Sequence, residues 1–109
     1  CPRPDELSSR PPLQWNKALA RAAQRQADWM AQQQQLSHGA PLKRRAKNVG
    51  YTYRAISENI AKTDSEPERM MQLWLKSPLH CINILNPEYR DIGVGSNNGY
   101  WTVILGSEL

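Results

Sequence analysis

A long amphipathic stretch that begins at Asn16 is the feature that most constrains how this chain can fold. Apolar residues recur through it at helical spacing: Leu19, Ala23, Ala27 and Met30, with Ala20 and Ala31 widening the stripe. This spacing places them on one face of a helix, and that face must be buried against a partner. Asn16 is a good N-cap residue, and residues 32–35 are expected to form the exposed last turn.

Two shorter helices are predicted after the first. Residues 41–49 carry a proline in their first turn, and Gly50 follows where a left-handed residue ends a helix. Ser65 and Glu68 have the spacing of a capping box ahead of a third helix. The apolar face of this helix carries Met70, Met71, Trp74 and Leu75. Residues 77–85 are expected to add a short helical turn.

The end of the chain has the pattern of a β-hairpin. Residues 92–95 and 100–105 are β-prone, and the Asn97-Asn98-Gly99 sequence between them tolerates positive φ. Residues 55–60 are predicted to form a further strand. Helices that precede strands on a small antiparallel sheet indicate a layered α+β domain.

The length of 109 residues suits one domain, residues 1–109, in which the proline-rich residues 1–12 form an irregular arm. No apolar run approaches the roughly 18 to 20 residues that a membrane span needs, and the N-terminus lacks the layout of a signal peptide. We therefore expect a soluble chain from which any export signal has been removed.

Basic residues exceed acidic ones, 14 to 10, giving a net charge of +4. The densest basic stretch consists of Lys43, Arg44, Arg45, Lys47 and Arg54. No aromatic platform or glycine-rich cradle is interleaved with these residues, so nucleic acid is not an expected partner. The stretch is predicted to be a solvated helix face, and contact with an acidic membrane or a cell-wall polymer is the alternative.

The two cysteines, Cys1 and Cys81, predict a disulfide in an oxidising compartment, because their number is even and no C-x-x-C motif is present. The protein is then secreted or periplasmic. The alternative is a membrane-anchored lipoprotein with lipid on Cys1 and Cys81 as a buried free thiol.

The chain has two histidines, His38 and His80, and neither belongs to a local metal motif. Any site that they share must be made by the fold. Ser37 and Ser77 lie beside them, but neither is in a G-x-S-x-G elbow, and both are better explained as helix caps than as nucleophiles. The tryptophans at positions 15, 29, 74 and 101 are expected to face the core, with Trp74 buried against the first helix and the sheet. Three glutamates, Glu66, Glu68 and Glu88, are expected at caps or on the surface.

Several phrases in the sequence resemble the CAP superfamily, which groups cysteine-rich secretory proteins, antigen 5 and plant pathogenesis-related class 1 proteins. The matching phrases are Leu13-Gln14-Trp15-Asn16, Leu36-Ser37-His38, Gly50-Tyr51, Glu58-Asn59-Ile60-Ala61, Trp74 with Ser77-Pro78-Leu79-His80, Asn83-Ile84-Leu85, Gly93-Val94-Gly95 and Tyr100-Trp101. They cover nearly the whole chain, and their pattern resembles that of the bacterial branch. The resemblance implies a three-layer α-β-α sandwich around a central cleft.

In the family this cleft holds two histidines and two glutamates, often with a divalent metal. His38, Glu58 and His80 match three of these positions, and Ser77 stands where eukaryotic relatives have the second glutamate. Ser57 replaces the usual glycine before the glutamate, and Cys81 replaces the usual basic residue after the second histidine.

The resemblance therefore implies that His38 and His80 bind a divalent metal such as zinc. Glu58 would complete the shell, orient one ring, or act as a general base on a metal-bound water.

Three functions follow from these residues. The first is a cleft that binds a small ligand, peptide or divalent metal without robust enzymatic turnover. The second is a metal-dependent hydrolase acting on peptide bonds, with Glu58 as its base. The third is an interaction module of the cell envelope that uses the basic face and not the cleft.

Overall fold

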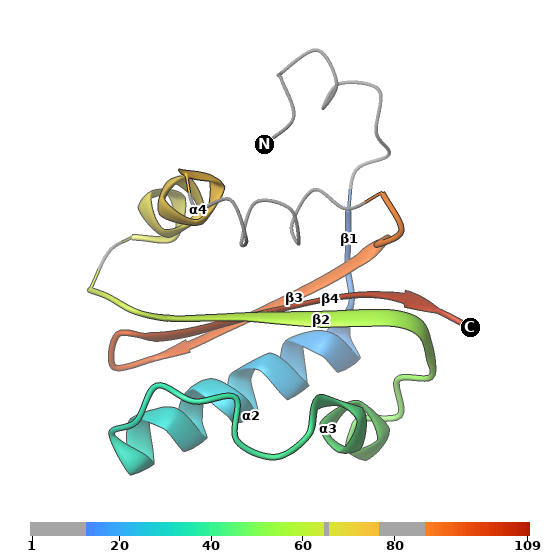
Figure 1. Cartoon of the computed structure of the whole chain (residues 1–109), viewed down its shortest axis with the longest axis horizontal. Helices are drawn as coiled ribbons and strands as arrows, with labels where there is room; N and C mark the ends of the chain where they lie inside the picture. The colour runs from blue at the N-terminus through green and yellow to red at the C-terminus, as the bar shows by residue number, and fades with distance from the viewer. Residues whose placement is uncertain (1–12, 65, 77–86) are drawn as a thin grey trace.

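The structure is a computed structural model that describes residues 13–64, 66–76 and 87–109. The helices of this part are α2 (Lys17–Gln33), α3 (Leu42–Asn48) and α4 (Pro67–Lys76), and its strands are β1 (Gln14–Trp15), β2 (Tyr53–Lys62), β3 (Asp91–Asn97) and β4 (Tyr100–Glu108). In Figure 1, α2 and α3 cover one face of the sheet and α4 lies over the other. The predicted α+β class and three-layer sandwich are confirmed.

The sheet is built around the predicted hairpin. β3 and β4 are joined by a two-residue turn in which Asn98 and Gly99 both have positive φ, at 50° and 83°. β2 pairs antiparallel with β4 from Tyr53 to Lys62, so this strand is longer than predicted. Within the described residues the strand order is β1-β3-β4-β2. The short β1 pairs in parallel with β3, and this strand was not predicted from the sequence.

The helix α2 has the cap and the buried face that its sequence predicts. The side-chain oxygen of Asn16 accepts a hydrogen bond from the Leu19 amide at 3.0 Å, and Gln34 ends the helix in the left-handed conformation. The helix lies very close to β3. A Cβ added at Gly93 would overlap the backbone of Ala20, and one added at Gly95 would overlap the backbone of Gln24.

Two apolar cores lie on opposite faces of the sheet. The core under α2 and α3 consists of Leu19, Ala22, Ala23, Ala46, Val49, Tyr51 and Ile104. The core under α4 consists of Met70, Trp74, Tyr89, Val103 and Leu105. Residues of β4 alternate between them, as the period of a strand requires.

The four tryptophans do not all face the core, although the sequence predicted that they would. Trp74 is buried, but it packs on the face of the sheet opposite α2, so the expected contact with the first helix is wrong. Trp29 and Trp101 are half-buried. Trp15 is 60% exposed, and among the described residues its strand β1 lies at the edge of the sheet.

The helix α3 is one residue shorter at each end than the helix predicted over residues 41–49. Pro41 is the N-cap and Val49 the C-cap, and Gly50 has the predicted left-handed φ of 74°. Ser65, the turn at residues 77–85, and both cysteines lie outside the described residues. No helix in the described part of the chain is both long and apolar enough to span a membrane.

The close approach of α2 to β3 predicts a large cost for a methyl group at Gly95. Gly95→Ala is expected to lower the free energy of unfolding by about 3 kcal/mol, because backbone atoms of α2 would have to move. Gly50→Ala is the control, because no atom lies within 4 Å of the added Cβ and only the positive φ is penalised, at about 1 to 2 kcal/mol. Urea unfolding measures both, and equal costs would contradict this account of the α2 interface.

Candidate functional site

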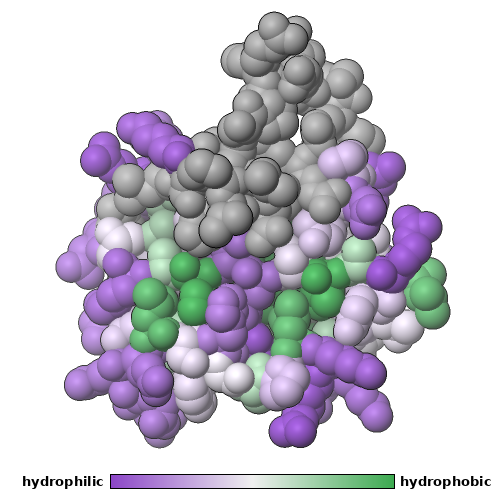
Figure 2. Space-filling view, viewed as in Figure 1, coloured by the Kyte–Doolittle hydropathy of each residue, from purple (hydrophilic) through white to green (hydrophobic). Residues whose placement is uncertain are grey.

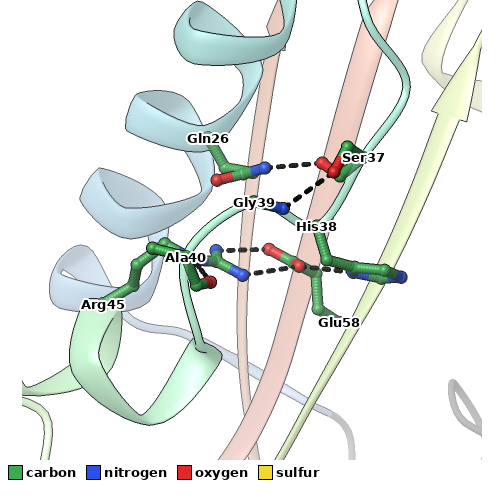
Figure 3. Close-up of polar contacts among 7 residues, drawn as sticks. All are labelled: Gln26, Ser37, His38, Gly39, Ala40, Arg45 and Glu58. Carbon is green, nitrogen blue, oxygen red and sulfur yellow. Dashed lines mark hydrogen bonds and ion pairs between the residues drawn. The ribbon is translucent and has the colours of Figure 1, made fainter.

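His38 lies in the loop between α2 and α3, and this loop is tied to α2. The amide of the buried Gln26 donates to the Ser37 carbonyl at 2.7 Å, and the Ser37 hydroxyl accepts from the Gly39 amide at 3.1 Å (Figure 3). The Ser37 hydroxyl therefore serves the backbone of its own loop. These contacts fix the position of His38 between two anchored residues.

Glu58 reaches the same place from β2. It is two residues from Ile56, so both side chains point to the sheet face that α2 and α3 cover. The Glu58 side chain is only 2% exposed. A carboxylate taken out of water at this depth requires charged or hydrogen-bonding partners.

Arg45 of α3 is the main partner. Its two terminal nitrogens donate to the two carboxylate oxygens of Glu58 at 2.6 and 2.8 Å, and its Nε donates to the Ala40 carbonyl at 2.9 Å. All three guanidinium nitrogens are therefore used, in the forked geometry that suits a carboxylate. Figure 3 shows the guanidinium facing the carboxylate across the gap between α3 and β2.

This contact corrects the expectation that the whole basic stretch is solvated. Arg45 is 12% exposed in its side chain and points inward. The signal was present in the sequence, because Arg45 falls on the apolar stripe of α3, three residues after Leu42 and four before Val49. Because Arg45 is charged, it was predicted to be solvated like its exposed neighbours.

The imidazole of His38 completes the arrangement. Its Nδ1 lies 2.7 Å from Oε1 of Glu58, and the ring remains 62% exposed. A carboxylate paired with arginine accepts hydrogen bonds, so Nδ1 carries the proton and donates. In the neutral ring, Nε2 then keeps its lone pair, and it lies on the side away from Glu58 (Figure 3).

Glu58 and His38 therefore have different chemical capacities. Both oxygens of Glu58 already accept hydrogen bonds, and the side chain is nearly inaccessible, which leaves little room for it to take a proton from water. Nε2 of His38 is the exposed base or ligand. This nitrogen is suited to bind a metal, while the Glu58 carboxylate accepts the hydrogen bond from Nδ1 and so orients the ring.

Other predicted site residues are placed as follows. His80 and Ser77 lie outside the described residues, so their place relative to His38 is not defined. Among the residues that the structure describes, no group of three or more His, Cys, Asp or Glu side chains could hold a metal. Glu66 and Glu88 are exposed, in agreement with the expected surface positions.

Comparison with known proteins gives three kinds of match. Residues 7–104 match the model of the CAP family, described as the cysteine-rich secretory protein family. A relative from Bacillus subtilis strain 168, the uncharacterized protein YkwD, is 33% identical over 97 residues, which are 84% of this chain and 38% of YkwD. The chain thus spans well under half the length of this relative.

Solved structures show the same fold. An extracellular protein with an SCP domain from Bacillus anthracis matches 94% of this chain and 36% of its own, with a TM-score of 0.87 and 25% identity. A cysteine-rich secretory protein from Staphylococcus aureus matches 94% of this chain and 34% of its own, with a TM-score of 0.81 and 20% identity. An outer surface protein from Borrelia burgdorferi matches 96% of this chain and 84% of its own, with a TM-score of 0.82 and 19% identity.

The burial of Glu58 predicts that Arg45 cannot be removed alone. Arg45→Met is expected to lower the free energy of unfolding by about 3 to 5 kcal/mol, because it leaves a buried charge unpaired. Adding Glu58→Gln should recover part of this loss. Lys43→Met, an exposed position on the same helix, is the control and should stay within about 0.5 kcal/mol of the wild type. A loss at Arg45 no larger than at Lys43 would refute the buried pair.

The hydrogen bond to Glu58 also predicts the tautomer of His38. Nitrogen-15 NMR of the imidazole should show neutral His38 with its proton on Nδ1. In the double variant Arg45→Met/Glu58→Leu, which removes both charges together, the preference should return toward the Nε2–H form of free imidazole. A native spectrum with the proton on Nε2 would contradict the geometry.

Proposed function

The chain belongs to the CAP family of cysteine-rich secretory proteins, and from this premise we propose that it binds a divalent metal or a small ligand at His38. One observation carries the proposal: an exposed imidazole is oriented by a carboxylate that is itself buried and held by arginine. The fold thereby presents one ring nitrogen, Nε2, in a fixed direction toward solvent.

A purely structural role does not account for this arrangement. The pair of Arg45 and Glu58 is complete without the histidine, because Arg45 donates to both carboxylate oxygens. A contact from a ring that is 62% exposed adds little stability, since water screens it. What the contact does provide is a single tautomer and a restricted ring orientation, and both are requirements of a ligand to a metal.

Zinc fits this chemistry, because imidazole nitrogen is one of its preferred ligands. His38 would bind zinc through Nε2, and Glu58 would orient the ring by accepting the hydrogen bond from Nδ1. His80 is the expected second ligand, from the family resemblance. Two protein ligands leave open positions, so the metal would exchange readily and could accept a further ligand such as a peptide carbonyl.

The burial and the hydrogen bonds of Glu58 favour a binding function over a hydrolytic one. A general base must reach the water or substrate that it deprotonates. The Glu58 carboxylate is 2% exposed and accepts hydrogen bonds from two residues, so it is poorly placed for that task. We therefore propose a binding domain without robust peptidase turnover.

An extracytoplasmic location belongs to the same proposal. The solved relatives are described as an extracellular protein, a secretory protein and an outer surface protein. A secreted or periplasmic location would also allow a disulfide between Cys1 and Cys81. Lipid on Cys1 would instead attach the domain to a membrane, and intact-mass analysis before and after reduction distinguishes these two states.

The metal is tested by thermal unfolding with zinc chloride, with and without chelator. At a hundredfold excess of zinc over its dissociation constant, the wild type should gain about 2.7 kcal/mol. His38→Ala should abolish this gain. The double variant Arg45→Met/Glu58→Leu keeps the histidine but not its support, and should weaken zinc binding by about 10- to 100-fold.

Glu66→Gln is the matched control, because it removes an exposed carboxylate outside the site, and it should keep the full gain. An absent shift in the wild type, or an equal shift in His38→Ala, would exclude the proposed metal site.

A further inference from the structure

A groove runs beside α3, on a part of the surface separate from His38. Its volume is about 750 Å³, within the range of small-molecule sites. The lining is mainly apolar and includes Pro41, Tyr51 and Tyr53, and three cations of α3 also contribute to it: Lys43, Arg44 and Lys47. Figure 2 shows that hydrophobic patches cross the middle of one face of the molecule, while hydrophilic residues predominate along its lower margin, over α2 and α3.

The floor of the groove is anchored by a buried hydrogen bond. Tyr51 is 4% exposed, and its hydroxyl donates to Oδ2 of Asp91 at 2.7 Å. Burial, together with the hydrogen bond and the charge of Asp91, raises the pKa of Tyr51 well above its usual value, so the phenol stays neutral and keeps donating. This bond fixes the segment after Gly50 to the start of β3. The hydrogen bond thus holds the Tyr51 side of the groove in place.

No carboxylate among the described residues neutralises the cations of the groove. Lys43, Arg44 and Lys47 are exposed, and within the described part of the chain no carboxylate forms an ion pair with them. Lys43 and Lys47 are one helical turn apart, so they lie on the same side of α3. Their neighbour Arg45 contributes nothing here, because its nitrogens are used inside the fold.

We propose that this groove binds an anionic phosphodiester polymer, a chain of polyol or sugar units joined by phosphates. The phosphates would lie among Lys43, Arg44 and Lys47, and the carbon-rich units between them would cover the apolar floor. Repeated negative charges match a row of cations spaced along a helix. The net charge of +4 attracts such a chain from a distance.

Other anionic partners fit the groove less well. A free phosphate ion would use the cations but leave the apolar lining uncovered. A flat membrane surface would contact the exposed cations but leave the apolar lining of the groove largely uncovered. Single-stranded nucleic acid needs successive aromatic faces on which bases stack. Among the lining residues the ring of Tyr51 is almost completely buried, which leaves the half-buried Tyr53 as the one aromatic residue that could offer such a face.

The test measures binding of synthetic oligo(glycerol phosphate) to the whole chain by calorimetry at several salt concentrations. Lys43→Ala/Lys47→Ala should weaken binding by about tenfold or more and reduce the slope of log affinity against log salt by roughly 1 to 2. Lys17→Ala/Arg21→Ala removes two exposed charges from α2 and is the matched control. It should change neither quantity by a comparable amount.

Three results would overturn the proposal. Equal losses in the two double variants would mean that diffuse charge alone attracts the polymer. If inorganic polyphosphate bound as tightly as oligo(glycerol phosphate), the apolar floor would make no contribution to specificity. Binding of single-stranded DNA in place of oligo(glycerol phosphate) would assign the groove to another class of polymer. The zinc experiment at His38 is independent of all three, because the two sites share no residue.

Discussion

The buried carboxylate of Glu58 is the constraint on which the candidate site depends. It lies on β2 with its side chain 2% exposed, and a charge at that depth must be matched by fixed donors. Arg45 supplies two of them and thereby sets the position of α3 against the sheet, while its Nε holds the backbone at Ala40. The third donor is His38, which the same loop carries. The direction of an exposed imidazole is thus decided by an ion pair that solvent hardly reaches.

This geometry also depends on how deeply α2 sits on the sheet. Gly93 and Gly95 have no side chains, so the backbone of α2 comes into direct contact with β3. At that depth Gln26, on the buried face of α2, reaches the carbonyl of Ser37 and anchors the loop beside His38. The two glycines thus allow α2 to lie close against the sheet, and α2 in turn anchors the loop that carries His38. The Gly-Val-Gly phrase has a packing role, which explains it without any chemistry at the site.

The sequence predicted those elements whose signals are local. The stripe and cap of α2, the glycine after α3 and the turn at Asn98 and Gly99 follow from side-chain chemistry within a few residues. β1 could not be predicted this way, because two residues show no alternation. Periodicity indicated that Trp74 is buried, but it does not say against which layer. Glu58 and His38 came from family resemblance, whereas Arg45 was missed because a charged residue on an apolar stripe was assigned to solvent.

The two faces of α3 show how four neighbouring basic residues can serve different ends. Arg45 is withdrawn from solvent, and each of its three guanidinium nitrogens already donates a hydrogen bond inside the fold. Lys43, Arg44 and Lys47 point elsewhere and remain available. A seven-residue helix thus holds the internal support of one site and the exposed charges of another. The division follows from the helical period, because Lys43 and Lys47 are four residues apart and lie on one side of α3, whereas Arg45 lies halfway between them in sequence and faces Glu58.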